Sequence, residues 1–110
     1  MHNESIREYC LSLPDTEEST PFGPDVLVYK VKGKIFLLLP LDTGDCRFNV
    51  KCDPEKALEL RDQYPCVVPG YHMNKKHWNT VLADGTVSDR LLKEWIQDSY
   101  QLVNKAGKKR

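Results

Sequence analysis

Hydrophobic and polar residues alternate in two segments of the first half of the chain, DVLVYKVKG (25–33) and CRFNVKC (46–52). A period of two is the pattern of a β-strand with one face in the core. Between them, KIFLLLP (34–40) is apolar almost throughout, which is typical of a strand at the centre of a sheet. The connections KGK and LDTGD are too short for parallel crossovers, so the pattern predicts an antiparallel three-stranded meander.

Apolar residues recur at the spacing of an α-helix in three other segments. The first helix is expected to be capped by Asn3 and ended by Pro14. The second is expected to begin after Asp53, an N-cap residue that is followed by a proline in the first turn. The third and longest helix is expected to be capped by Ser88 and to reach about Val103.

The remaining segments complete the predicted order. The acidic stretch PDTEESTPFGP (14–24) is interpreted as an ordered loop, while CVVPG and HWNTVLADG supply one or two short strands. This order predicts an α+β two-layer sandwich, in which an antiparallel sheet of about five strands has helices packed on one face. Residues 1–104 are expected to form a single domain, followed by a basic C-terminal tail at 105–110.

Composition excludes some classes of protein but does not indicate a function. No apolar run is long enough to span a bilayer and the N-terminus lacks the features of a signal peptide, so we expect a cytoplasmic, monomeric protein without membrane contacts. The four cysteines contain no CxxC pair and are interpreted as reduced thiols. A metal site using Cys46, Cys52, His72 or His77 would match no zinc spacing, so no metal or other cofactor is expected.

Charge is balanced overall but unevenly distributed. The formal net charge is zero, which argues against strong indiscriminate binding to nucleic acid. Residues 1–29 carry six acids against one base, whereas residues 30–52 carry five bases against two acids. A local basic surface can still bind an anion, with an affinity that falls steeply with salt.

One candidate surface lies on the predicted sheet. Five polar side chains alternate with core residues on two strands and should share the solvent face: Lys30, Lys32, Arg47, Asn49 and Lys51. If these strands are neighbours, the charges form one patch, and the KGK hairpin with Lys34 adds a wing of the kind that contacts the DNA backbone. The alternative is that these are the solvated lysines usual on the wet face of an antiparallel sheet.

A second candidate is the polar stretch PGYHMNKKHWNTV (69–81). In a binding role its lysines and histidine would contact phosphate and an aromatic face would stack on a ring. The residues expected to make these contacts are His72, Asn74, Lys75 and Lys76. In a structural role Trp78 is a core residue, and His72 and His77 hydrogen-bond loop carbonyls.

Ser99 and Tyr100 raise the question of catalysis, since a serine near a histidine suggests a nucleophile and base. No Gly-x-Ser-x-Gly elbow is present, and Ser99 lies inside a predicted helix. We therefore expect these two residues to dock the helix by meeting His72, His77 or Trp78. An acid–base enzyme centred on His72 and His77 is the least favoured interpretation, and no enzyme activity is expected.

The segment from Pro69 to Val103 resembles the C-terminal signature of the MmcQ/YjbR-like family of small bacterial proteins. The likeness rests on a Pro-Gly-Tyr-His segment, a Lys-x-His-Trp strand start and a helix with Ser-Tyr-x-x-Val. The residues that carry it are Tyr71, His77, Trp78, Ser99 and Tyr100. The earlier part, with its Tyr-Cys pair and VYKVKGKIFLLL, fits the same family, so the resemblance covers nearly the whole chain.

The resemblance implies a CyaY-like fold, like that of the bacterial frataxin homologue, and DNA binding of a "double-wing" type. It does not imply iron binding, because the first helix offers only Glu4 and Glu8. Two functions follow as hypotheses. The first is modest binding of double-stranded DNA by the basic sheet face, the 72–77 loop and the C-terminal tail. The second is a non-catalytic module that binds a protein or small ligand at the Tyr71–Trp78 loop.

Overall fold

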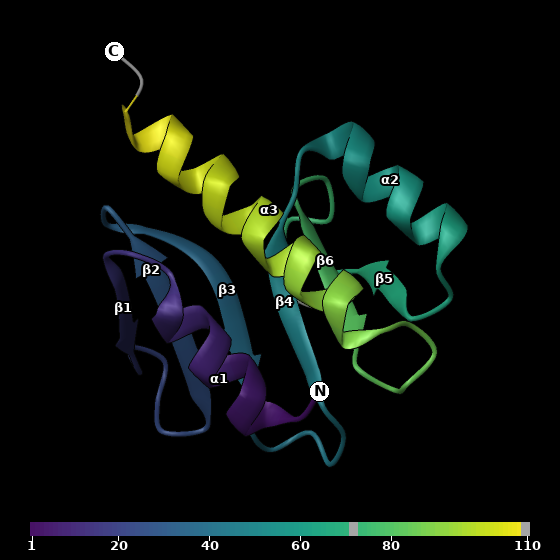
Figure 1. Ribbon diagram of the computed structural model, residues 1–110, viewed down its shortest axis with the longest axis horizontal. Coiled ribbons are helices and arrows are strands. Elements are labelled where there is room, and N and C mark those ends of the chain that lie inside the picture. Colours follow the sequence, from purple (N-terminus) through teal and green to yellow (C-terminus); the bar gives the residue numbers. More distant parts are fainter. Residues whose placement is uncertain (71–72, 109–110) are drawn as a thin grey trace.

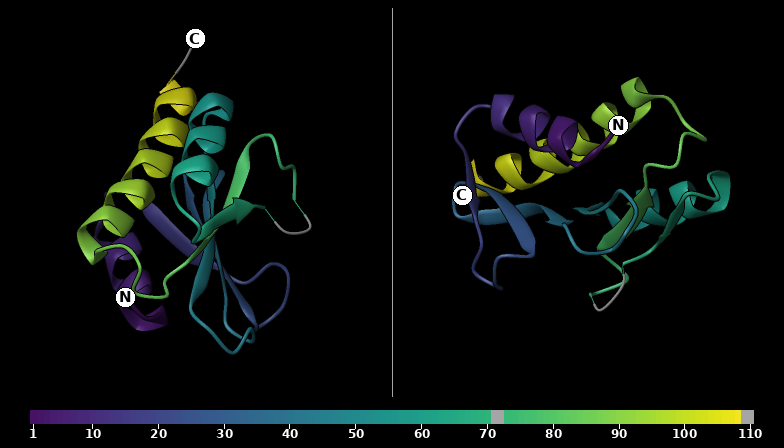
Figure 2. Two further views of the ribbon diagram at one scale, coloured as in Figure 1. Left: turned by 90° about the vertical axis from the view of Figure 1, so that its right-hand side faces the viewer. Right: turned by 90° about the horizontal axis from the view of Figure 1, so that it is seen from below.

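The computed structural model of the chain describes residues 1–70 and 73–108, with side chains as far as Lys105. Its elements form two layers, with a twisted sheet on one side and helices on the other (Figures 1 and 2). In chain order they are α1 (Asn3–Ser12), β1 (Thr16–Ser19), β2 (Val26–Val31), β3 (Lys34–Pro40), β4 (Arg47–Lys51), α2 (Pro54–Gln63), β5 (Val67–Pro69), β6 (Trp78–Leu82) and α3 (Asp89–Lys108). The predicted α+β sandwich is confirmed.

The sheet is antiparallel throughout the described residues and has the strand order β1-β2-β3-β4-β6-β5. The meander β2-β3-β4 is the one that the alternating pattern predicts. At the β2–β3 turn, Lys32 and Gly33 have φ values of 55° and 79°. Positive φ at both central residues is what a two-residue hairpin of type I′ requires, and glycine adopts it without strain.

The sheet has six strands where about five were expected, because β1 forms inside the acidic segment interpreted as a loop. Its inward-facing residues, Thr16 and Glu18, are both polar, so the apolar pattern gave no sign of it. The Glu18 carboxylate accepts hydrogen bonds from the Tyr29 hydroxyl at 2.7 Å and from Arg7 Nε at 2.8 Å. This network fastens the edge strand to β2 and α1.

Helix boundaries agree closely with the sequence. Asp53 caps α2 and Ser88 caps α3, as predicted. The prediction for α1 is wrong by one residue, because His2 is the N-cap and forms a capping box with Ser5. At the other end of the chain, α3 continues to Lys108, so the first part of the segment predicted as a basic tail is helical.

The core lies between the sheet and the helices. Figure 2 shows α1 and α3 on one face of the sheet, and α2 packs beside α3 against β5 and β6. Trp95 of α3 is 4% exposed and packs edge-on against Tyr64 at a centroid distance of 5.0 Å. Cys10 and Cys66 are buried, as expected for core thiols, while Cys46 and Cys52 are half-buried. In the described part of the chain no helix is long and apolar enough to cross a membrane.

Candidate functional site

The open face of the sheet does not carry one continuous basic patch. The predicted patch required β2 and β4 to be neighbours, but β3 lies between them. One row of directly paired residues crosses all six strands on this face and carries no charge: Ser19, Val28, Leu38, Asn49, Thr80 and Val68. This neutral row separates the predicted cations into two groups.

Arg47 lies on one side of the neutral row and is already paired. Its guanidinium donates two hydrogen bonds to the Asp45 carboxylate, at 2.9 and 2.7 Å. The hydrogen bond from Arg47 is also the main reason why the pKa of Asp45 falls to about 2. Because a bidentate pair locally neutralises both charges, Arg47 adds little to a surface that attracts anions.

Four lysines lie on the other side of the row, and we call their surface the basic end: Lys30, Lys32, Lys34 and Lys51. Lys32 and Lys34 are exposed at the β2–β3 turn. Lys34, Lys51 and His77 line one depression of about 250 Å³, which also contacts Leu102 and Val103 of α3. The C-terminal end of α3 lies on the same side of the molecule as the β2–β3 turn (Figures 1 and 2).

The Asn74–Trp78 segment is held by hydrogen bonds among its own polar groups and to the end of β4. The Asn74 carboxamide oxygen accepts from the Lys76 amide at 3.0 Å. The Asn74 carbonyl accepts from the amides of His77 and Trp78, at 3.1 and 3.0 Å. The His77 carbonyl in turn accepts from the Cys52 amide at 2.6 Å. Lys75 and Lys76 remain exposed, whereas the predicted contacts of Tyr71 and His72 lie outside the described residues.

Two residues that the sequence analysis did not single out fix this segment to α2. Asn79 is fully buried; its Oδ1 accepts from Arg61 Nε at 2.6 Å and its Nδ2 donates to the Ala57 carbonyl at 3.2 Å. Arg61 also donates to the carbonyl of Lys75. The available signal was a polar residue at an inward-facing position of the strand WNTVL, where its carboxamide must find partners.

The structure corrects the role predicted for Trp78. The residue is half-buried and lies opposite Lys51 on the open face, so it is not a core residue. The backbone of Trp78 lies close to Gly70 and explains why a glycine occupies that position. A Cβ on Gly70 would lie 2.9 Å from the Cβ of Trp78, and the Gly70 amide donates to the Trp78 carbonyl at 2.9 Å. Only glycine permits this close approach of β5 and β6.

Ser99 and Tyr100 dock α3, as predicted, but onto different partners. Ser99 Oγ donates to the Phe36 carbonyl at 2.6 Å and accepts from the Lys51 amide at 3.0 Å, which joins β3 and β4 where their ladder ends. The Tyr100 hydroxyl donates to the Pro14 carbonyl at 2.5 Å, and its ring packs on Phe36. These hydrogen bonds and the ring contact join the two side chains to the sheet and to the residues after α1, rather than to the Asn74–Trp78 segment.

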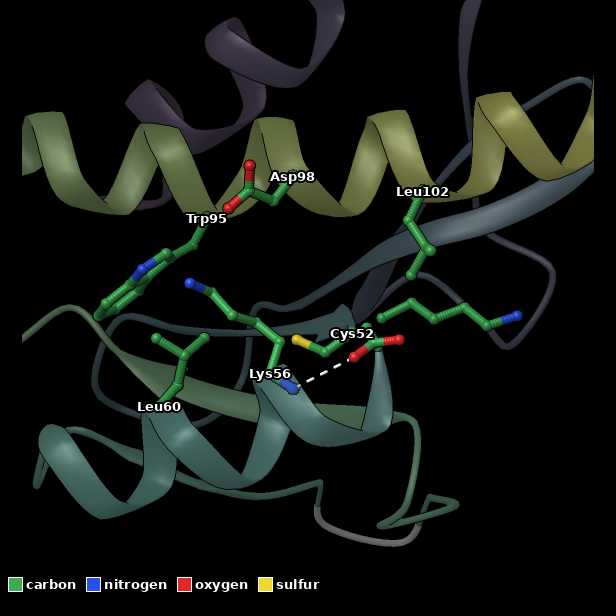
Figure 3. A pocket seen from close by; sticks show the side chains of 8 residues that line it. Cys52, Lys56, Leu60, Trp95, Asp98 and Leu102 are labelled. Atoms are coloured by element: carbon green, nitrogen blue, oxygen red, sulfur yellow. Dashed lines mark hydrogen bonds between the residues drawn. The ribbon is translucent and has the colours of Figure 1, made fainter.

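A cleft lies between α2 and α3 (Figure 3), and the sequence analysis did not foresee it because its lining residues are far apart in the chain. It has a volume of about 230 Å³ and an apolar lining of Leu60, Trp95 and Leu102. Its polar lining consists of Lys51, Cys52, Asp53, Lys56 and Asp98. Trp95 and Leu60 lie at one end and Leu102 toward the other, with the Cys52 sulfur between them (Figure 3). We call this feature the α2–α3 cleft.

Burial changes the chemistry of two groups in the α2–α3 cleft. It raises the pKa of the Cys52 thiol to about 11, which keeps the sulfur protonated and weakly nucleophilic near neutral pH. Burial also raises the pKa of Asp98, against an opposing attraction to Lys56. No three His, Cys, Asp or Glu side chains in the described residues are grouped to hold a metal ion. This lining suits non-covalent binding.

Comparison with known proteins agrees with this fold and leaves the function open. Residues 11–102 match the model of the family described as YjbR. The uncharacterised protein YbdF of Escherichia coli O157:H7 is 44% identical over 101 residues, which cover 92% of this chain and 83% of YbdF. The uncharacterised protein YjbR of Escherichia coli K12 is 32% identical over 96 residues, covering 87% and 81% of the two chains.

Two solved structures share the fold across nearly the whole chain. The crystal structure of Deinococcus radiodurans protein DR2400, a DUF419 domain, superposes with a TM-score of 0.91 at 40% identity and covers 99% of this chain and 83% of that one. A crystal structure of a Pseudomonas syringae protein gives a TM-score of 0.80 at 31% identity, covering 94% and 99% of the two chains.

Proposed function

This chain belongs to the YjbR family, and from the arrangement of its lysines we propose that it binds double-stranded DNA with modest affinity through the basic end. The observation that carries the proposal is the convergence of lysines from separate strands. Lys34 at the start of β3 and Lys51 at the end of β4 line the same depression. Lysines spaced in this way can contact phosphate oxygens without reading bases.

The β2–β3 turn supports the same function. Lys32 and Lys34 flank Gly33 on a two-residue turn, and all three residues are exposed. Among residues 1–70 and 73–108, no ion pair joins Lys30, Lys32, Lys34 or Lys51 to a carboxylate. A projecting hairpin with unpaired lysines can lie along a DNA backbone as a wing. The zero net charge limits the affinity, because little long-range attraction assists the encounter.

The test is fluorescence anisotropy of a labelled short duplex, titrated with the protein at several salt concentrations. We expect micromolar binding at low salt, with log K falling by about 0.9 per neutralised phosphate for each unit of log salt concentration. The double variant Lys32→Glu/Lys34→Glu should bind at least tenfold more weakly. The control Arg90→Glu/Lys93→Glu makes the same charge change at exposed positions near the start of α3.

Absence of binding at low salt would overturn the proposal, as would equal losses in both double variants, since equal losses would show sensitivity to net charge alone. The exposed Lys75 and Lys76 belong to the other predicted contact surface. Lys75→Glu/Lys76→Glu tests whether the loop adds to the affinity. We expect a smaller loss than at the basic end, because Arg61 and Asn74 hold that loop through hydrogen bonds inside the protein.

A further inference from the structure

The α2–α3 cleft combines an apolar lining with charged groups at its rim. Leu60 of α2 and Trp95 of α3 are buried and face each other across it, and Leu102 is 37% exposed at its edge. At about 230 Å³ it is smaller than the 300–1,000 Å³ typical of pockets for drug-sized molecules. It therefore suits a small metabolite, and an apolar lining with a few polar groups is the usual composition of such sites.

The charges around the cleft are not equivalent. The Asp53 carboxylate is engaged as the N-cap of α2, where it accepts from the amides of Glu55 and Lys56 at 3.2 and 3.3 Å. Asp98 interacts electrostatically with Lys56 across the cleft. Neither Lys51 nor Lys56 has an ion-pair partner in the described part of the chain. Because Lys56 is attracted to Asp98, we take Lys51 as the cation that meets a ligand.

The cleft continues toward a second cation. The neighbouring depression shares Lys51, Cys52, Asp53 and Leu102 with the α2–α3 cleft, and it adds Lys34 and His77. The two share these lining residues and form one trough. Trp95 and Leu60 line one end, with the Lys56 amine beside them (Figure 3), and Lys51 and Lys34 line the other. A ligand that matches the trough needs an apolar body and a negatively charged head.

We propose that the α2–α3 cleft binds a small amphipathic anion, namely a monocarboxylate with a medium-length alkyl or aryl body. The apolar body lies between Leu60, Trp95 and Leu102, and the carboxylate faces Lys51 and Lys34. Burial of the apolar body supplies most of the affinity, and the lysines select the sign of the charge. This site goes beyond DNA binding, although it shares Lys34 and Lys51 with the basic end.

The experiment compares three probes of the same chain length by isothermal titration: octanoate, octylamine and octanol, all below micellar concentrations. Octanoate should bind with a Kd on the order of 1 mM, as expected for a small ligand in a partly open cleft. Octanol and octylamine should bind at least fivefold more weakly, because neither carries a negative charge for the lysines. If octylamine or octanol binds as tightly as octanoate or more tightly, the cleft does not select anions. If octanoate does not bind, the proposed site is wrong.

Matched variants locate the binding. Leu102→Glu places a negative charge at the cleft edge, whereas Leu11→Glu makes the same change on α1, at a side chain of similar exposure (40% against 37%). Octanoate should bind Leu102→Glu at least tenfold more weakly and Leu11→Glu as it binds the wild type. Leu102→Ala, which removes apolar surface without adding charge, should weaken binding severalfold. Equal losses in Leu102→Glu and Leu11→Glu, or full affinity in Leu102→Glu, would contradict the assignment.

A DNA titration of Leu102→Glu keeps the two proposals separate. Leu102 also borders the depression lined by Lys34 and Lys51. The substitution leaves Lys32 and Lys34 in place, so DNA binding should change less than octanoate binding. Loss of octanoate binding with DNA binding retained supports the cleft as an independent site. Retention of octanoate binding in Leu102→Glu would overturn the cleft and leave the DNA proposal standing.

Discussion

The Asn74–Trp78 segment and the α2–α3 cleft are both rich in polar side chains, but they use them differently. In the segment, the Asn74 carboxamide and carbonyl are occupied by neighbouring amides, and Arg61 fastens the chain to α2. In the cleft, Lys51 has no ion-pair partner among the described residues, and an apolar lining lies beside it. The segment is a structural connection, and the cleft has the composition of a binding site.

A cluster of polar residues that are close in the sequence is therefore weak evidence for a binding site. Polar groups that are close in the chain readily satisfy one another, because they can meet without closing a long loop. The cleft lining comes from α2, the end of β4 and α3, which lie far apart in sequence. If the comparison is right, substitutions around Asn79 should destabilise the protein, while those in the cleft should change binding and hardly affect stability.

Asn79→Ala should give the largest effect. The substitution leaves Arg61 Nε without its carboxamide acceptor and removes a donor from the Ala57 carbonyl, and a buried polar group that loses its partner costs about 1–3 kcal/mol. We expect the free energy of unfolding to fall by about 2–4 kcal/mol in chemical denaturation. Gln101→Ala, at an exposed amide on α3, is the control and should change it by less than about 0.5 kcal/mol. Equal effects of both substitutions would contradict the structural role.

Ser99→Ala should come next. The variant removes a donor from the Phe36 carbonyl and an acceptor from the Lys51 amide, so α3 loses its polar attachment to β3 and β4. The expected loss in the free energy of unfolding is about 1–3 kcal/mol. Ser12→Ala is the matched control, because that hydroxyl bonds an exposed helix carbonyl. A Ser99→Ala variant as stable as Ser12→Ala would show that packing alone holds the helix.

Lys56→Ala should leave stability within about 0.5 kcal/mol of the wild type, because an exposed side chain is removed. Its loss frees the Asp98 carboxylate from its nearest cation in the cleft and so increases the repulsion of an anionic ligand. We expect octanoate to bind a few times more weakly in calorimetry. A loss of stability comparable to that of Ser99→Ala would place Lys56 in the structural network and not in the binding site.

Asp98→Asn should give the smallest effect, with a sign opposite to that of Asn79→Ala. Burial raises the pKa of Asp98 above its ordinary value of 3.8, so the charged form costs stability once the pH exceeds that value. The cost is absent below about pH 3.8 and complete above the pKa of the folded state. The variant should therefore melt slightly higher than the wild type at pH 7.

The measurement for Asp98→Asn is the difference in melting temperature from pH 3 to pH 7. Asp62→Asn, at an exposed aspartate of α2, reports the effect of removing one negative charge elsewhere. The effect at Asp98 should be small because the residue as a whole is exposed, although its carboxylate is partly desolvated in the cleft, and solvent screens its interactions. A variant that melts lower than the wild type at pH 7 would show that attraction to Lys56 outweighs burial.

Much of the fold followed from local signals. Alternation predicted β2 and β4, and the caps Asp53 and Ser88 were visible because capping depends on residues close in the chain. Strand β1 was not predicted, because Glu18 occupies an inward-facing position where a hydrophobic residue is usual. Alternation also predicted that Lys30, Arg47 and Lys51 share one face, but the patch required β2 and β4 to be neighbours, and in the meander β3 lies between them.

The site was less predictable than the fold. Arg61 and Asn79 are separated by 18 residues and meet only after α2 packs on β6. Lys51 and Leu102 line one cleft only because α3 crosses the end of β4. The spacing of residues in a single sequence does not reveal such pairs. The family resemblance implied the fold but gave no indication of the cleft.

The most direct test of the account is the change in backbone and tryptophan indole NMR shifts as octanoate is added to the wild-type protein. The account predicts progressive shifts at Cys52, Lys56, Asp98 and the Trp95 indole, with little change from Asn74 to Trp78. Shifts concentrated at Asn74–Trp78, or spread evenly over the surface, would contradict it. In that case the cleft would be a packing feature and the polar segment would be the place to look for a ligand.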